Sequence, residues 1–177
     1  MTSILKGIYT LLTKLDASQA ITIGKRGIIS FPAGYYVYVG SALNGIEVRV
    51  ARHLKKEKPL HWHIDYFLQK AQVKEIIAGS TEKKMECTIA SHIGRKLTPV
   101  PHFGCSDCRC TGHLYFCKNR RVLRSVVRDC FKECGIRATL IRVEHQKSLA
   151  GSTVRHLHQI LQKSFSAKFT EADRYLR

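Results

Sequence analysis

The sequence lacks any run of about 18 apolar residues, the length that a membrane-spanning helix requires. Its first residues, 1–6, also lack the apolar stretch and small-residue cleavage site of a secretory signal. No low-complexity tract interrupts the chain, and its 44% hydrophobic residues suffice for a buried core, which argues against disorder. We therefore expect a folded cytoplasmic protein without a membrane partner.

Acidic residues are scarce: 13 Asp and Glu stand against 30 Lys and Arg, which gives a net charge of +17. Folding requires no such excess, whereas a polyanionic partner would account for it. Nucleic acid is the leading candidate, because each phosphate that a cationic side chain neutralises releases condensed counterions. The alternative is a basic surface that is simply solvated. We expect a nucleic-acid partner, with DNA as the first candidate.

The seven cysteines are an odd number, which argues against a complete disulfide framework and favours reduced thiols or a metal site. Cys105, Cys108 and Cys110 lie close together in the sequence, and His113 follows them. These four residues have enough soft ligand atoms for one tetrahedral Zn²⁺, although the gap between the last two cysteines is tighter than in common zinc modules. The alternatives are buried reduced thiols, or a substrate loop in which Asp107 provides an acidic group.

Strand-forming and helix-forming segments alternate along the 177 residues, a length that suits one compact domain with a modest extension. β-Branched and aromatic runs predict strands at residues 6–15, 20–23, 27–31, 35–40, 73–78, 113–118 and 136–143. Helical periodicity predicts helices at residues 45–57, 61–70, 82–97, 122–135 and 151–162. Asn44 and Glu47 predict an N-terminal cap for the first helix. We expect an α/β (α+β) fold, with a small mixed sheet of three central strands flanked by helices.

Two tripeptides, an arginine on a helix and a later glutamate follow one another in order along the chain. They are Gly7-Ile8-Tyr9, Tyr38-Val39-Gly40, Arg49 and Glu86. This ordered set resembles the signature of the GIY-YIG nuclease family over residues 6–118. The resemblance implies a nuclease domain at residues 1–118, followed by a basic C-terminal extension of strand and helix at residues 119–177.

A narrower resemblance concerns two further segments of the chain. Residues 61–66, His-Trp-His-Ile-Asp-Tyr, and the tripeptide Ser106-Asp107-Cys108 resemble segments of an uncharacterised branch of the same superfamily. Some members of that branch are fused to endonuclease III homologues. The resemblance therefore implies a partner repair enzyme as well as DNA.

The family resemblance implies a metal-dependent endonuclease that hydrolyses phosphodiester bonds in DNA, with a role in repair. In this family the tyrosines, here Tyr9 and Tyr38, position or deprotonate the attacking water, and the late glutamate, here Glu86, holds Mg²⁺ or Mn²⁺. Such hard cations need only one or two carboxylates. Glu86 also falls on the apolar stripe of its predicted helix, where a carboxylate is costly unless it binds a cation, pairs with Arg49 or meets a helix end.

Several basic residues are candidates for contacts with the substrate. Arg49 and His53 lie one helical turn apart, so both can contact one phosphate, and Arg49 can stabilise transition-state charge. An unperturbed tyrosine has a pKa of about 10 and is a poor base at neutral pH, so His61 or His63 is an alternative base. The remaining candidates are expected to contact the nucleic-acid backbone from solvent-facing positions: Arg52, Lys55 and Lys56.

Two other classes of function fit the same sequence. One is a non-catalytic nucleic-acid-binding module, which would show salt-sensitive binding without turnover. The other is a zinc-stabilised interaction protein whose cysteine loop docks a partner enzyme. The family often completes its site with an asparagine, and Asn119 is the only late candidate, at a position where it can equally cap a helix.

Overall fold

The computed structural model describes residues 5–143, 157 and 159–163, and its main feature is a six-stranded sheet in the order β6-β7-β4-β1-β5-β8. The strands of this sheet are β1 (Gly7–Leu15), β4 (Gly34–Ala42), β5 (Gln72–Ser80), β6 (Thr98–Pro99), β7 (Leu114–Cys117) and β8 (Thr139–Arg142). A separate two-stranded sheet is formed by β2 (Gln19–Thr22) and β3 (Ile28–Phe31). The helices within residues 5–143 are η1 (Gly24–Arg26), α1 (Ile46–Leu54), α2 (His63–Phe67), α3 (Glu86–Gly94) and α4 (Arg120–Glu133).

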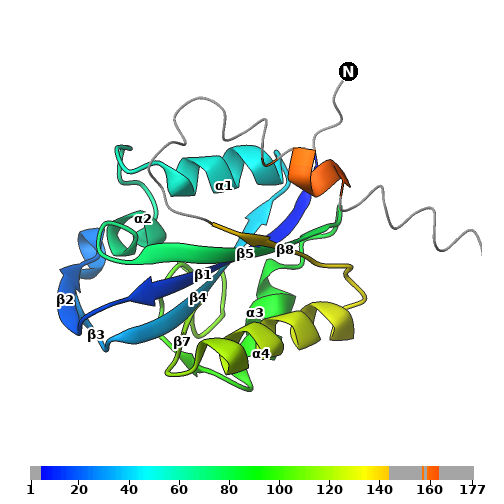
Figure 1. Cartoon of the computed structure of the whole chain (residues 1–177). Helices are drawn as coiled ribbons and strands as arrows, with labels where there is room; N and C mark the ends of the chain where they lie inside the picture. Colours follow the sequence, from blue (N-terminus) through cyan, green and yellow to red (C-terminus); the bar gives the residue numbers. More distant parts are fainter. Residues whose placement is uncertain (1–4, 144–156, 158, 164–177) are drawn as a thin grey trace, which may run out of the picture.

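Helices cover both faces of the central sheet. The helices α1 and α2 lie on one face, and α3 and α4 lie on the other (Figure 1). Side chains alternate along β1, so Tyr9 and Leu11 join the core on the α1 side, whereas Ile8 and Leu12 join the core on the α4 side. Almost all of β1 is buried, as expected for a central strand covered on both sides. The tyrosine of the first tripeptide therefore belongs to the α1 face.

The α+β fold with a small central sheet flanked by helices, as predicted from the sequence, is confirmed. Two details of the sheet differ from the expectation: it has six strands, and each of its described pairings is antiparallel rather than mixed. Strand direction depends on the connections between elements, which composition alone does not encode. The strand β6 has only two residues, too few for a periodic signal.

Helices α1, α2 and α3 are shorter than the sequence predicts, α4 has the predicted length but begins two residues earlier, and the cap of α1 is different. Helix α1 begins after Gly45, whose φ of 116° suits glycine, and no side chain caps it. The predicted cap at Asn44 is therefore wrong, and Glu47, its expected capping-box partner, is buried. Helix α3 begins only at Glu86, because residues 81–85 form a bend and loop.

Helix α4 packs in the core formed by residues 5–118, and β8 joins their sheet, although the sequence places both elements in an extension. Leu123 and Val127 of α4 pack in one cluster with Ile8 of β1. Strand β8 pairs antiparallel with β5. The folded domain therefore extends beyond residue 118, because it includes α4 and β8.

A buried ion pair holds α4 against the sheet. Glu75 of β5 is completely buried and accepts hydrogen bonds from Arg120 and Arg124 of α4, at 2.6 Å and 2.8 Å. Burial by itself would raise the pKa of the Glu75 carboxyl, but the two guanidinium groups lower it below its usual range. The carboxylate is therefore charged at neutral pH and fixes Arg124 in place.

The C-terminal region is described only in part. Residues 157 and 159–163 are helical, and the rest of the helix predicted at residues 151–162 lies outside the described residues. Leu157 and Leu161 are buried in the core on the α1 side. Within the ranges that the structure describes, no helix is long and apolar enough to cross a membrane.

Candidate functional site

A cavity of about 570 Å³ opens on the α1 side of the sheet. Its lining includes most of the residues that the sequence singles out, contributed by two strands, three helices and two loops. These residues are Tyr9, Tyr38, Arg49, His61, His63, Glu86 and Asp107. The ordered set that the sequence predicts for one site is therefore brought together around one cavity.

The register of β1 and β4 places the two tyrosines on the same face of the sheet. Tyr9 lies opposite Gly40, and Tyr38 lies opposite Leu11, two residues further along β1. A Cβ atom at Gly40 would lie 2.4 Å from the Tyr9 hydroxyl oxygen, so only glycine leaves room for the phenol. Gly7 is required for a similar reason, since its Cβ would lie 2.1 Å from the carbonyl oxygen of Gly79. The glycines of both tripeptides thus have a steric role.

Both tyrosine hydroxyls are protonated at neutral pH. Burial raises the pKa of Tyr9 well above its ordinary value, and nearby Tyr38 adds to the rise. Burial likewise raises the pKa of Tyr38, with a further contribution from Glu86. Deprotonation of water by a tyrosinate is therefore not favoured here, and the phenols are hydrogen-bond donors.

His53 lies behind Tyr9 rather than in the cavity. Its Nε2 is 2.7 Å from the Tyr9 hydroxyl, and its ring is buried. Burial lowers the pKa of His53, so the ring is neutral at neutral pH. Its Nδ1 lies 3.8 Å from the Asp65 carboxylate, which favours the proton on Nδ1 and leaves Nε2 to accept from Tyr9. The expectation that His53 shares a phosphate with Arg49 is wrong, because the ring supports Tyr9 instead.

Asp65 is a completely buried carboxylate that organises the turn between α1 and α2. It accepts two hydrogen bonds from the Arg52 guanidinium, at 2.9 Å and 3.0 Å, and one from each backbone N–H of His61 and Trp62. Burial alone would raise the pKa of Asp65, but the nearby His53 side chain, the Arg52 guanidinium and the two backbone N–H groups hold it well below its usual range. Arg52 is therefore committed to Asp65 and is not the solvent-facing contact that the sequence predicts.

Trp62 holds the cavity arginine and was not identified as a site residue from the sequence. The guanidinium carbon of Arg49 lies 4.4 Å from the centroid of the Trp62 ring, and that of Arg52 lies 4.1 Å from it. Such cation–π contacts are worth roughly 0.5–2 kcal/mol. Arg49 is thus oriented by an aromatic ring, and among the described residues it has no ion pair with a carboxylate.

The two candidate bases differ in availability. The Nδ1 atom of His63 accepts a hydrogen bond of 3.0 Å from the backbone N–H of Gly104, so a neutral His63 carries its proton on Nε2. Burial, followed by the charge of Arg26, lowers the pKa of His63, which favours that neutral form. His63 is therefore a donor toward the cavity rather than a base. His61 is exposed at the cavity and packs its ring 5.3 Å from Trp62.

Glu86 is the first residue of α3, and its side chain is 30% exposed. Its Oε1 lies 3.0 Å from Nδ1 of His113, not against Arg49 as one reading of the sequence proposes. Because helix α3 begins at Glu86, the carboxylate precedes the apolar stripe of Ile89, Ala90 and Ile93 instead of lying within it. Glu86 therefore lines the cavity and also contacts His113.

A group of three cysteines and one histidine lies beside the cavity and can hold a metal ion. Its members are Cys87, Cys108, Cys110 and His113, whose ligand atoms all lie within 4.8 Å of one another. The sequence predicts Cys105 in place of Cys87, and this assignment is wrong. The Cys105 carbonyl accepts a hydrogen bond of 3.4 Å from the N–H of Cys108 in a tight turn, and its buried thiol is not part of the group.

Three other predicted residues lie away from the cavity. Lys55 and Lys56 are exposed just beyond the end of α1 and do not line it. Asn119 caps α4, since its side-chain oxygen accepts from the backbone N–H groups of Arg121 and Val122 at 2.8 Å and 3.2 Å. The capping alternative for Asn119 is confirmed.

The fold and the site define a small antiparallel α+β domain with a cavity of tyrosines, arginine and carboxylates beside a group of cysteines and histidine. The chain belongs to the family described as Domain of unknown function DUF123, whose family model matches residues 8–136. This match covers β1 from its second residue onward and all of β2 to β7, and it includes the residues lining the cavity, the group of three cysteines and one histidine, and α4. No curated protein and no solved structure gave a match.

Proposed function

We propose that this protein hydrolyses phosphodiester bonds in nucleic acid, with DNA as the substrate, in a reaction that depends on Mg²⁺ or Mn²⁺. The observation that carries the proposal is that Tyr9, Tyr38, Arg49 and Glu86 line one cavity although they lie far apart in the sequence. Around one phosphate, a cationic fork can stabilise developing charge, phenol hydroxyls can orient water, and a carboxylate can hold the cation. The net charge of +17 supports nucleic acid as the partner. The resemblance to the GIY-YIG nucleases extends the proposal to a role in repair, beside a partner repair enzyme.

Each cavity residue has a chemical role in this proposal. Arg49, oriented by Trp62, binds two phosphate oxygens and stabilises the charge that develops on them. The protonated hydroxyl of Tyr38 donates a hydrogen bond to the attacking water or the phosphate. The Tyr9 hydroxyl donates its one proton to His53, so it positions the attacking water by accepting a hydrogen bond from it. His61 is the imidazole that accepts the proton of the water, because Nδ1 of His63 is already engaged with Gly104.

The donor atoms of the cavity fit a hard divalent cation. Glu86 and Asp107 both line it, and carboxylate oxygens are the ligands that Mg²⁺ and Mn²⁺ prefer. A carboxylate has two oxygens, so Glu86 can face His113 with Oε1 and a cation with Oε2. When bound, the cation neutralises phosphate charge and lowers the pKa of its water.

Zn²⁺ is the ion proposed for the group of Cys87, Cys108, Cys110 and His113, because three thiolates and one imidazole form a closed tetrahedral set of the kind found in structural zinc sites. The ion would tie the loop that precedes β7 to the start of α3. Zinc-bound histidines generally donate their second N–H to a carboxylate, and Glu86 lies 3.0 Å from Nδ1 of His113. The zinc site would thereby fix the orientation of the proposed catalytic carboxylate.

Replacing Arg49 by alanine is expected to lower single-turnover cleavage of DNA by roughly 10²- to 10³-fold, the usual loss when one preorganised donor to a developing charge is removed. Product formation from end-labelled DNA with Mg²⁺ or Mn²⁺ measures the effect. Arg95→Ala is the matched control, because Arg95 is exposed and does not line the cavity. Equal rates for wild type and Arg49→Ala would exclude the proposed role of the guanidinium.

Replacing Cys87 by serine is expected to remove bound zinc from the purified protein, whereas Cys105→Ser should retain one ion per chain. The structure groups Cys87 with the other three ligands and leaves Cys105 out of the group. Zinc content is measured by atomic emission after gel filtration. Retention of zinc in Cys87→Ser together with loss in Cys105→Ser would restore the ligand set predicted from the sequence.

A further inference from the structure

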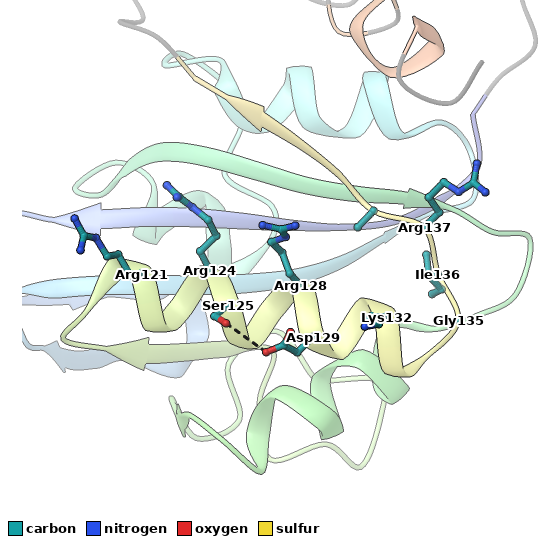
Figure 2. A pocket seen from close by; sticks show the side chains of 10 residues that line it. Arg121, Arg124, Ser125, Arg128, Asp129, Lys132, Gly135, Ile136 and Arg137 are labelled. Atoms are coloured by element: carbon teal, nitrogen blue, oxygen red, sulfur yellow. Dashed lines mark hydrogen bonds between the residues drawn. The ribbon is translucent and has the colours of Figure 1, made fainter. Parts of the chain in front are cut away.

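A second cavity, of about 740 Å³, runs along α4 and the loop that follows it. Figure 2 shows Arg121, Arg124 and Arg128 in a row along the helix, with Arg137 beyond its end. Helix α4 covers the face of the sheet opposite α1, so this α4 groove is separate from the cavity of Tyr9 and Arg49 (Figure 1). None of the residues in the α4 groove has a role in the proposed cleavage reaction.

Four cationic side chains of the α4 groove are free to bind a ligand. Arg121, Arg128 and Lys132 are separated by seven and four residues, which places them along one side of the helix over about 16 Å. Arg137 extends the row past the turn that ends α4. All four are exposed, and within the described part of the chain none of them forms an ion pair.

The remaining charged residues of the α4 groove are already engaged. Arg124 is held by the buried Glu75 carboxylate and so keeps the helix fixed on the sheet. Asp129 is the one acidic residue of the lining, and its carboxylate accepts a hydrogen bond of 3.3 Å from Ser125. Three of the four unpaired cations therefore lie on a helix that is fixed to the sheet, Arg137 continues the row beyond it, and Asp129 is the one acidic residue of the lining to offset their charge.

We infer that the α4 groove binds the phosphate backbone of nucleic acid independently of the cleavage cavity. Cationic side chains in a row, spaced along a helix axis, match a ligand with regularly repeated negative charges. An acidic protein partner would be expected to present apolar anchors to a matching pocket, and the apolar residues of this lining are only Ile136, which is buried, and Ala138. The ligand class favoured by the lining is therefore DNA or RNA backbone, recognised by charge and not by sequence.

The experiment measures binding without cleavage. A fluorescent DNA duplex is titrated with the full chain in EDTA at several salt concentrations, and wild type is compared with Arg121→Gln/Arg128→Gln/Lys132→Gln. Loss of three phosphate contacts is expected to weaken binding and to reduce the slope of log K against log salt by about 2.7. The matched control, Lys25→Gln/Lys70→Gln/Arg95→Gln, removes the same charge from exposed positions outside both cavities and is expected to leave that slope near the wild-type value.

The single variant Arg137→Gln keeps the test valid if the triple variant fails to fold, because Arg137 lies outside the helix. This variant is expected to reduce the slope of log K against log salt by about 0.9. An unchanged slope in both groove variants would overturn the inference. Polyglutamate is titrated in the same way as a model of an acidic protein. Groove variants that keep wild-type binding to DNA but lose binding to polyglutamate would also overturn the inference, since that result would identify an acidic protein as the partner. Because no cleavage is measured, failure of the proposed nuclease activity does not affect the outcome.

Discussion

Replacing Glu86 by alanine is expected to abolish cleavage of DNA while leaving binding intact. Glu86 is the cavity residue proposed to hold Mg²⁺ or Mn²⁺. Without it, Asp107 is the one carboxylate left in the cavity lining. The effect is measured as single-turnover product formation at saturating protein, beside the affinity for the same DNA in EDTA. Loss of activity with unchanged affinity separates a catalytic role from a binding role.

The controls for this variant follow from the contact between Glu86 and His113. Because the carboxylate lies 3.0 Å from a proposed zinc ligand, Glu86→Ala is also expected to lower zinc affinity, by about 10- to 100-fold. Zinc content is therefore measured on every preparation, and activity is compared only between fully loaded samples. Glu82→Ala removes an exposed carboxylate four residues earlier and should behave as wild type. Full activity in zinc-loaded Glu86→Ala would eliminate Glu86 from the reaction.

Replacing Asp65 by asparagine is expected to lower the free energy of unfolding by about 3–5 kcal/mol, the cost of breaking a buried ion pair by removing one partner. The carboxylate is completely buried and accepts four hydrogen bonds, two of them from Arg52. An amide has one acceptor oxygen and cannot satisfy the same donors. Loss of this anchor should also release Trp62 and, through it, Arg49.

Urea unfolding at several pH values measures this effect. The pKa of the Asp65 carboxyl is lower in the folded state, so its charge contributes fully to the free energy of unfolding above the unfolded pKa of about 3.9. That contribution is lost progressively as the pH falls from this value toward the lower pKa of the folded state. The wild type should therefore lose stability on acidification more steeply than Asp65→Asn. Asp16→Asn is the control, because Asp16 is exposed and forms a surface ion pair with Lys14, so the urea midpoint of this variant should stay at the wild-type value. A midpoint of Asp65→Asn equal to that of wild type would show that the anchor is dispensable.

The fold was largely predictable, because its strands carry strong local signals. The run from Tyr35 to Gly40 is aromatic and β-branched, and it forms most of β4. The edge strand β6 and the antiparallel directions were not predictable, since both depend on contacts between distant segments. The same holds for the N-terminus of α1, where the backbone conformation of Gly45 and not the side chain of Asn44 sets the first turn.

The candidate site was predictable only for the residues that the ordered set of motifs along the chain identifies. The tyrosines, Arg49 and Glu86 meet at one cavity, as their order indicates. Cys87 was missed because it lies far in the sequence from Cys108 and Cys110, and only the packing of α3 beside their loop brings it to them. Arg52 was misassigned because its partner, Asp65, is an unremarkable acidic residue until the turn before α2 buries it.

The most direct test of the central proposal is cleavage of labelled linear, nicked and branched DNA by the zinc-loaded wild-type chain, with Mg²⁺, with Mn²⁺ and with EDTA. The proposal predicts products that appear only with the divalent cation. Salt-sensitive binding to all three DNA forms without product from any of them would contradict it, and would instead identify a non-catalytic nucleic-acid-binding module.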